Sequence, residues 1–479
     1  MKHKFIKDIG FSGLTNLITS FRGIIILPII TKILGASNYG VWTQISVTVS
    51  LIAPIIVLGL PNAIVRFLIA NKDKEEIKEG IWSVFLVIVL ISLAVALIFI
   101  SFANFISSFL QVPIVFIFAI AIIIVLESLN SFFINLFRAF NEITKYSIFN
   151  VFNVFGEIVL VAFAVLFNYG LQGAILALII IRVLAFLILF IRTIKKIGIK
   201  IPQFIYIREY LHFSLPIVTS NISYWGVQLS DRYIIGFFMG ILFVGYYSPA
   251  YSIGNLIYLF IVPFIIVLPV TLSQLFDNNK IEDVKIYLEH SLKYLLMIGI
   301  PAVFGISILS HQILRIFSTM EIADNSYFIV PFIAISILFY GIYTIFTQIL
   351  FLFKKTKIPA VIWVFAMILN IGLNIALIPK IGLIGTALST LLSYVLATIL
   401  VWYYSFRYLQ FKIDYLFIIK SIIASIVMSR AIIYFNPRTL AEVISYIIMG
   451  VIIYALVIFV FKGIGKKEFN IIFSFLKRA

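Results

Sequence analysis

The sequence predicts an all-α polytopic membrane protein, and three observations support this fold class. Of the 479 residues, 63% are hydrophobic and only 11% are charged, whereas soluble domains keep about a quarter of their residues charged. Apolar runs of about 20 residues recur along the chain, each long enough to cross a bilayer as a helix. Alternation of polar and apolar residues with a period of two is absent, which argues against an outer-membrane barrel.

We expect about fourteen membrane-spanning helices, counted from the apolar runs. They cover residues 9–34, 39–65, 80–106, 113–138, 144–168, 171–192, 209–235, 241–271, 287–313, 326–353, 357–379, 382–406, 414–435 and 442–462.

The formal net charge is +17, from 36 basic and 19 acidic residues. A basic balance can indicate nucleic-acid binding. Here, however, most Lys and Arg residues fall in alternate connecting segments, such as 192–208 and 462–478. The positive-inside rule explains this asymmetry. It predicts a multi-pass protein of the plasma (inner) membrane with both termini in the cytoplasm and no nucleic-acid partner.

Several kinds of chemistry are excluded by composition and motif. The chain has no cysteine and only four scattered histidines, so thiolate catalysis and the common metal-ligand spacings are absent. It also has no phosphate-binding loop for ATP hydrolysis. We therefore expect a protein that is not an enzyme.

Two halves of the chain resemble each other. "NYGLQGA" with Gly170 corresponds to "KIGLIGT" with Gly382, and "GASNYGVW" with Gly40 corresponds to "GILFVGYY" with Gly245. The matches keep the same order at a similar offset, so we infer two parallel six-helix repeats, an arrangement typical of transporters. The expected division is an N-lobe of residues 1–200, a C-lobe of 201–412, and two extra helices with a cytoplasmic tail in 413–479.

Charged residues inside the apolar spans are candidates for substrate binding, because each costs at least about 2.5 kcal/mol in lipid unless it faces a cavity or a partner. Two arginines in the first helices of the repeats suit a phosphate or pyrophosphate, because Arg offers forked donors. The alternative is structural: Arg22 paired with Asp231, Gln44 bonded across a helix pair, Arg66 as an interface anchor. The candidate set is Arg22, Arg232, Asp231, Gln44, Asn16 and Arg66.

Three further charges lie in later helices of the first repeat, namely Glu127, Glu157 and Arg182. We interpret Glu157 and Arg182 as a buried structural pair, with proton transfer by Glu157 as the alternative.

Three stretches carry a resemblance to a known family. They are "LPIITKILGASNYGVW", "LSDRYIIGFFMGILFVGYYSPAYSI" and "NIGLNIALIPKIGLIGTALSTLLSY". Through these stretches and the order in which they occur, the chain resembles the polysaccharide-unit exporters, the O-antigen flippases of the Wzx type. These belong to the multidrug/oligosaccharidyl-lipid/polysaccharide, or MATE-like, exporter superfamily, and the resemblance covers nearly the whole chain.

The resemblance implies two helical lobes around a cavity that opens alternately to each side of the membrane. It implies a flippase for polyprenyl-(pyro)phosphate-linked oligosaccharide units in cell-surface polysaccharide (O-antigen, lipopolysaccharide) biosynthesis. Membrane lipids and a polysaccharide polymerase or ligase are then the expected partners. The alternatives are a cation-coupled multidrug antiporter of the same superfamily, which would favour buried carboxylates in the cavity, and a membrane enzyme, which would need longer loops.

The resemblance also bears on energy coupling, by Na⁺ or H⁺, with no other cofactor expected. Some superfamily members bind sodium in the C-terminal lobe, and Asn370, Asn374 and Thr390 match those positions, with Asn221 as a possible fourth ligand. Hard cations favour such oxygen ligands. The alternative is that the two amides hydrogen-bond across to the next helix and fix packing.

Overall fold

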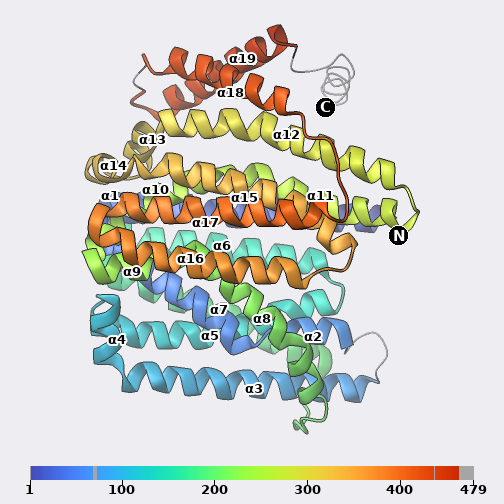
Figure 1. Ribbon diagram of the computed structural model, residues 1–479. Coiled ribbons are helices and arrows are strands. Elements are labelled where there is room, and N and C mark those ends of the chain that lie inside the picture. Colours follow the sequence, from blue (N-terminus) through green and yellow to red (C-terminus); the bar gives the residue numbers. More distant parts are fainter. Residues whose placement is uncertain (1, 68–72, 436, 463–479) are drawn as a thin grey trace. The chain divides into compact units, whose positions relative to one another are not determined.

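The structure is a computed structural model that describes residues 2–67, 73–435 and 437–462, and all regular secondary structure in this part is helical (Figure 1). The helices are α1 (Lys2–Val57), α2 (Leu60–Phe67), α3 (Lys74–Ser101), α4 (Ala103–Leu110), α5 (Ile114–Ala139), α6 (Ile143–Leu166), α7 (Gly170–Ile197), α8 (Ile207–Leu229), α9 (Asp231–Met239), α10 (Ile241–Gly254), a 3₁₀ turn η1 (Asn255–Ile257), α11 (Tyr258–Asp277), α12 (Ile281–Ile308), α13 (Ser310–Phe317), α14 (Met320–Ser326), α15 (Ile329–Leu352), α16 (Lys357–Ile381), α17 (Leu383–Phe406), α18 (Tyr415–Ile432) and α19 (Leu440–Val460).

In the described part of the chain, 12 helical stretches are long and apolar enough to cross a membrane. They correspond to the expected spans with two differences. The stretch Phe21–Val57 covers parts of two expected spans, 9–34 and 39–65. The break expected between them is present, because Gly35 has non-helical angles (φ 82°, ψ 176°) at a kink that separates two helical segments of α1. The expected span 209–235 is divided between α8 and α9 at Ser230, and it is not among the 12.

The two related glycine motifs adopt the same backbone conformation. Gly170, at the start of α7, has φ +64°, and Gly382, between α16 and α17, has φ +60°. This left-handed region disfavours residues with a Cβ. The shared conformation supports the predicted correspondence between the two motifs.

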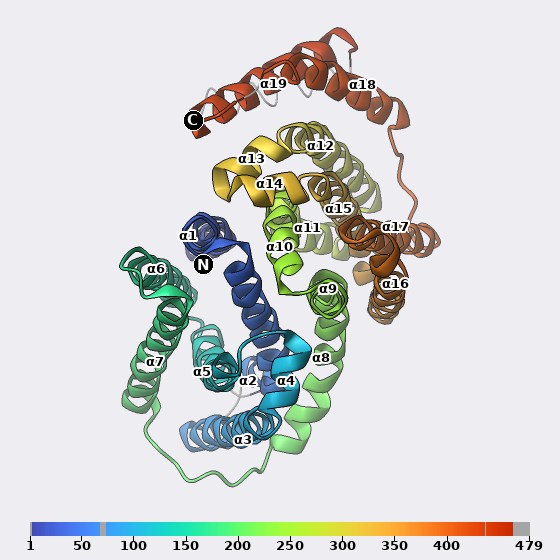
Figure 2. The same cartoon turned by 90° about the vertical axis from the view of Figure 1, so that its left-hand side faces the viewer.

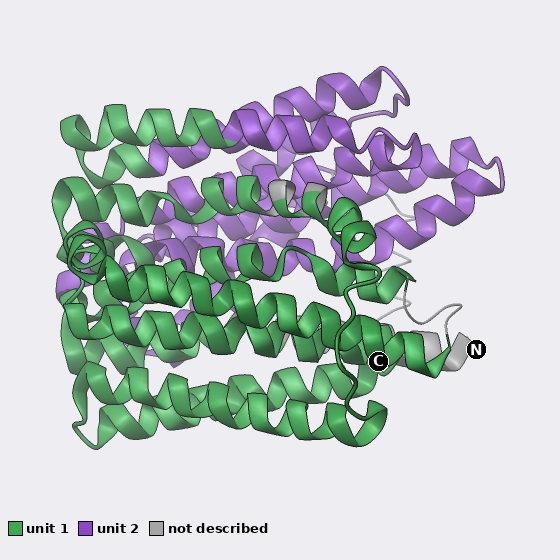
Figure 3. Cartoon of the chain, turned by 90° about the horizontal axis from the view of Figure 1, so that it is seen from below, with its two compact units in different colours: residues 1–248, 367–386 green, residues 249–366, 387–479 purple. Residues whose placement is uncertain are grey.

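Contacts between Cα atoms divide the chain into two compact units (Figure 3). Unit 1 comprises residues 1–248 and 367–386, and unit 2 comprises 249–366 and 387–479. These units follow packing rather than the repeat pattern, so the division into lobes at residues 200 and 412 stays a prediction.

In unit 1, α1 packs against α5 and α6, and α7 packs against α5 and α6 (Figure 2). Helix α3 covers the other side of α5, and α8 contacts the short helix α2. The four helices α1, α5, α6 and α7 thus meet, and the candidate site lies among them.

In unit 2, α12 packs against α11, α15 and α18, and α18 packs against α19. Helices α18 and α19 correspond to the two extra C-terminal helices expected from the sequence. Most of their large apolar side chains point outward, for example Ile419, Ile448 and Val451. Such surfaces suit contact with lipid.

Within unit 1, α1 and the start of α10 cross at two glycines. A methyl group added at Gly40 would lie 2.2 Å from the carbonyl oxygen of Ile241, and one added at Gly245 would lie 1.9 Å from that of Ala36. The contact is reciprocal, because the separation between Gly40 and Gly245 equals that between Ala36 and Ile241. Two repeats related by a two-fold axis would make such a contact.

The segment between the repeats is docked on α3. The carboxylate of Glu79 is buried and accepts hydrogen bonds from the backbone N–H groups of Gln203 (3.2 Å) and Ile205 (3.4 Å). The indole of Trp82 donates to the carbonyl of Gly198 at 2.8 Å. These contacts hold the linker in place, although the linker has no regular secondary structure of its own.

Candidate functional site

Four charged residues from four helices of unit 1 meet inside the apolar bundle. Arg22 of α1 and Arg182 of α7 both bind Glu157 Oε2 of α6, at 3.1 Å and 2.9 Å. Arg182 Nε also binds Glu127 Oε2 of α5 at 2.6 Å. The expected pair between Glu157 and Arg182 is therefore present, and the suggested pair between Arg22 and Asp231 is replaced by Arg22 and Glu157.

Exposure separates the members of this cluster. The side chain of Glu157 is 4% exposed and that of Arg182 is 14% exposed, while Arg22 retains 43% exposure. A guanidinium has five N–H donors. Arg22 therefore keeps accessible donors beyond its bond to Glu157.

The cluster lines a cavity of about 300 Å³ within unit 1. Its wall also includes Trp42, Ser46, Ser50 and Pro54 of α1. The volume is in the range of small-molecule sites. The formal charges of the four ionisable residues cancel. Arg22 is an accessible cation beside Arg182, Glu127 and Glu157, which together carry a charge of −1.

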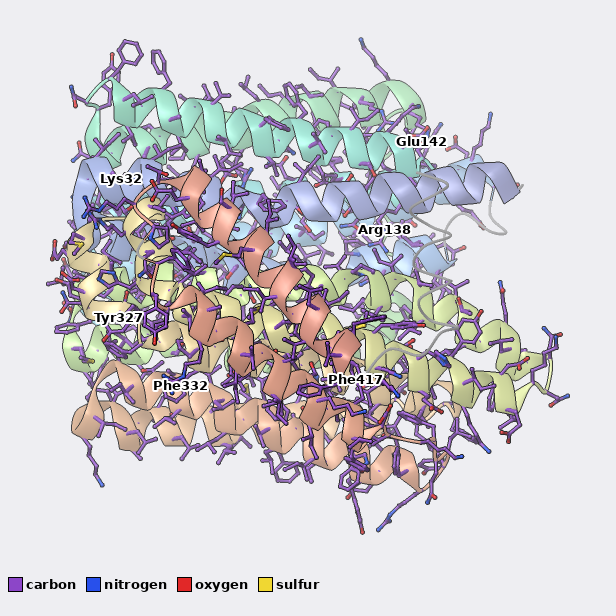
Figure 4. The ribbon with its side chains drawn as sticks, turned by 90° about the horizontal axis from the view of Figure 1, so that it is seen from above. Lys32, Arg138, Glu142, Tyr327, Phe332 and Phe417 are labelled. Carbon is purple, nitrogen blue, oxygen red and sulfur yellow. The ribbon has the colours of Figure 1, made fainter. Side chains whose placement is uncertain are left out.

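A second cavity of about 430 Å³ adjoins the first in unit 1. Both are lined by Ser50, Pro54 and Ser131. The second cavity extends to Arg138, at the end of α5. In Figure 4, Arg138 and Glu142 lie toward one end of the unit-1 helices and Lys32 toward the other.

Three of the predicted substrate residues form a separate buried cluster. Arg232 (3% exposed) binds the carboxylate of its neighbour Asp231 at 2.5 Å, and Tyr247 donates to the same carboxylate at 2.6 Å. Gln44 donates from Nε2 to the backbone carbonyl of Arg232 at 3.0 Å. None of the three predicted residues lines either of the two cavities, so the structure does not bring them together with Arg22.

The remaining predicted substrate residues are placed as follows. Arg66, at the end of α2, is exposed and lies with its guanidinium carbon 4.7 Å from the ring centre of Phe213. That geometry is a cation–π contact. Arg66 lines neither cavity, although Asn62 on the same short helix lines the second one. The side chains of Asn16 and Asn221 lie outside the described residues.

The two amides of α16 are fully buried and bond to each other. Asn374 Nδ2 donates to the backbone carbonyl of Asn370 at 2.9 Å and to its Oδ1 at 3.0 Å. Asn374 Oδ1 and the hydroxyl of Thr390 are buried without a hydrogen-bond partner among the described residues. An amide oxygen such as Asn374 Oδ1 is a ligand type that hard cations favour. No group of three His, Cys, Asp or Glu residues in the described part could hold a metal ion.

Fold and site together define a helical membrane protein with a charged cavity in unit 1. Comparison with known families agrees. The family described as "Polysaccharide biosynthesis protein" matches residues 5–276, and the family described as "MatE" matches residues 216–376. The first match covers more than half of the chain, so this chain belongs to the polysaccharide biosynthesis protein family.

Solved structures share the fold. The structure titled "Lipid II flippase MurJ, inward closed conformation" superimposes with a TM-score of 0.76 at 19% identity, covering 94% of this chain and 98% of that one. An inward-facing MATE-family multidrug resistance transporter of the MOP superfamily gives 0.66 at 15% identity, covering 82% and 94%. The MATE-like fold is therefore confirmed.

Two curated relatives are similar in sequence. A "Probable low-salt glycan biosynthesis flippase Agl15" of Haloferax volcanii is 24% identical over 277 residues, or 57% of this chain and 58% of that protein. The alignment thus spans little more than half the length of that relative. An uncharacterized membrane protein of Methanocaldococcus jannaschii, MJ1375, is 22% identical over 403 residues, covering 81% and 94%.

Proposed function

We propose that this protein is a flippase that moves polyprenyl-(pyro)phosphate-linked oligosaccharide units from the cytoplasmic to the outer leaflet by alternating access. The observation that carries the proposal is Arg22, a 43% exposed cation in a cavity within apolar helices. The family assignment and the flippase names of the relatives support the same class.

The chemistry of the proposed substrate sets what the protein must supply. A sugar headgroup with a charged phosphate cannot cross hydrocarbon unaided, whereas a polyprenyl tail can stay in lipid. A flippase therefore needs a polar cavity with a cation for the phosphate and an apolar exterior for the tail. The cavity at Arg22 meets the first requirement, and the lipid-facing surfaces of unit 1 and unit 2 meet the second.

The ion pairs of the site allow Arg22 to change partner. Arg182 stays bonded to Glu157 when Arg22 leaves, so that carboxylate is not stranded without a cation. A buried charge left alone would cost several kcal/mol. In our proposal a phosphate oxygen replaces Glu157 at Arg22, and Arg182 holds the two carboxylates in place.

Transport in reconstituted vesicles tests the proposal. Purified protein would be placed in liposomes with a fluorescent polyprenyl-pyrophosphate oligosaccharide, and the outer-leaflet fraction would be followed over time against protein-free liposomes. Protein-dependent movement of this lipid supports the proposal. Failure to move any lipid with several glycans tested would refute it.

A multidrug antiporter is the second candidate, because the cavity contains the carboxylates Glu127 and Glu157 beside the arginines. Glu127 is 36% exposed and could meet an organic cation. Vesicles that export a cationic dye against a Na⁺ or H⁺ gradient, while leaving the lipid-linked oligosaccharide in place, would favour this candidate.

We place the protein in the plasma (inner) membrane with both termini in the cytoplasm, because of the charge asymmetry of its connecting segments. O-antigen or another surface polysaccharide is the proposed product, and a polymerase or ligase the proposed partner.

Coupling to a cation is proposed at α16 and α17, with ligands from Asn370, Asn374 and Thr390. Replacing Asn374 by Ala removes the orphaned Oδ1. If Na⁺ binds there, transport by the wild type rises with Na⁺ and that of Asn374→Ala does not. Equal rates in Na⁺ and K⁺ buffers for the wild type would contradict sodium coupling.

A further inference from the structure

The second cavity of unit 1 differs chemically from the first. The first contains four ionisable side chains, whereas Arg138 is the one charged side chain among the described residues that line the second. Its other polar lining comes mainly from amides and aromatic residues. The residues that matter here are Asn62, Asn135, Tyr224, Trp225 and Gln228.

The aromatic part of this wall is held in place by hydrogen bonds. Trp225 Nε1 donates to Ser50 Oγ at 3.0 Å, and the indole contacts the ring of Tyr233 at a centroid distance of 5.8 Å. Gln228 Nε2 donates to the hydroxyl of Tyr224 at 2.6 Å. Because Ser50 lines both cavities, the indole sits at the junction between them.

Such a lining suits a neutral, hydroxyl-rich ligand. An aromatic ring presents a large apolar face that can cover the C–H face of a sugar ring. Side-chain amides combine a donor and an acceptor, which matches neighbouring hydroxyl groups. A phosphate is better served in the first cavity, where Arg22 is exposed.

We propose that the second cavity is a glycan subsite, in which Trp225 stacks on the sugar next to the phosphate and Asn62, Asn135 and Gln228 bind its hydroxyl groups. This inference rests on the proposed function and deepens it. The two cavities are contiguous, as are the phosphate and the first sugar in the substrate. Specificity for the glycan then resides in α2, α5 and α8, and affinity for the phosphate in α1.

Binding of short-chain ligands to the purified full-length protein tests the subsite. The probes are farnesyl pyrophosphate and farnesyl pyrophosphate bearing one sugar, with N-acetylglucosamine, glucose, galactose and rhamnose compared. We expect at least one sugar to tighten binding to the wild type. In Trp225→Ala this gain falls about tenfold, the scale of one aromatic contact, while binding of sugar-free farnesyl pyrophosphate is unchanged.

Two control variants sharpen the result. Trp225→Phe keeps an apolar ring and should retain most of the sugar-dependent gain. Trp402→Ala removes an exposed indole of α17 that lines neither cavity, and should leave all affinities unchanged. Unfolding temperatures of all variants establish that each is folded.

The outcomes separate this inference from the proposed function. If Arg22→Ala abolishes binding of both probe types but Trp225→Ala keeps the full sugar-dependent gain, the subsite is wrong and the flippase proposal stands. Equal loss for both probes in Trp225→Ala also overturns the subsite. If no probe binds, or if Arg22→Ala binds the probes as tightly as the wild type does, the proposed function is wrong and so is the subsite.

Discussion

Arg22 and Arg182 contact the same carboxylate oxygen but are expected to have different roles. Arg182 is 14% exposed and joins two carboxylates, whereas Arg22 is 43% exposed and joins one. Removing one partner of a buried ion pair leaves an uncompensated charge. Exposed pairs contribute little to stability.

We therefore predict that Arg182→Ala lowers stability by about 3–5 kcal/mol, and that Arg22→Ala changes it by less than about 1 kcal/mol. Thermal unfolding of the purified variants in one detergent compares them directly. Equal destabilisation by the two substitutions would contradict the distinction between a structural and a substrate-binding arginine.

The glycines at the crossing of α1 and α10 give a second prediction at the residue scale. Gly40→Ala and Gly245→Ala each place a methyl group within 2.2 Å of a backbone oxygen. Backbone must then shift, at a cost of about 1–3 kcal/mol. Gly23→Ala is the control, since a methyl group there has no atom within 4 Å. Unfolding temperatures should fall for the first two variants and not for the third.

At the scale of the element, the end of α7 is tied to the α5–α6 turn by Glu142. Burial alone would raise the pKa of Glu142, but hydrogen bonds with Lys196, Lys145 and Arg192 outweigh it and lower the pKa to about 2 from 4.5. A carboxylate with a lowered pKa stabilises the fold above the unfolded value of 4.5. That contribution is lost as the pH falls from 4.5 toward 2.

Glu142→Gln should therefore be less stable than the wild type at pH 7, by roughly 1 kcal/mol for a partly exposed network. The difference between the two proteins should narrow as the pH falls from 4.5 toward 2, where the wild-type carboxylate also becomes neutral. Unfolding temperatures of both proteins between pH 7 and pH 3 measure it. A difference that stays constant over this range would show that the charge of Glu142 is not responsible.

The docked linker offers another prediction for an element. Glu79→Ala removes the acceptor for the N–H groups of Gln203 and Ile205. The linker should then detach, and trypsin should cleave after Lys200 several times faster than in the wild type, because cleavage follows local opening. Ser83→Ala removes the acceptor for Phe204 N–H at 3.1 Å and a donor to Glu79 Oε1 at 2.6 Å, but it leaves the Glu79 carboxylate in place, so it should have a smaller effect. Unchanged cleavage in Glu79→Ala would show that the linker is held by other contacts.

For the whole molecule, much of the fold follows from the sequence, because an apolar run of about 20 residues has few alternatives to a membrane helix. The glycine motifs at Gly170 and Gly382 also indicated real turns with positive φ. The expected break between residues 34 and 39 is also real, because Gly35 has non-helical angles and separates two helical segments of α1. Sequence alone does not give the angle between two such segments.

The candidate site was only partly predictable. Arg22 was found because a charge in an apolar run is costly and conspicuous. Its partners come from three other helices, and no spacing along the chain reveals which charges meet. A charge in an apolar run also made Arg232 a candidate. In the structure, however, Arg232 pairs with the carboxylate of its neighbour Asp231 in a buried cluster. Trp225 was missed because aromatic residues are abundant in this chain and most suit lipid contact equally well.

We propose that the cavity at Arg22 carries the phosphate of a lipid-linked oligosaccharide across the membrane. The most direct measurement compares transbilayer movement of a fluorescent polyprenyl-pyrophosphate oligosaccharide in liposomes containing wild type, Arg22→Lys or Arg22→Ala. We predict that Arg22→Ala slows movement at least tenfold with an unchanged unfolding temperature, and that Arg22→Lys is intermediate because it keeps the charge but not the forked donors. Wild-type rates in a folded Arg22→Ala variant would show that Arg22 does not carry the phosphate.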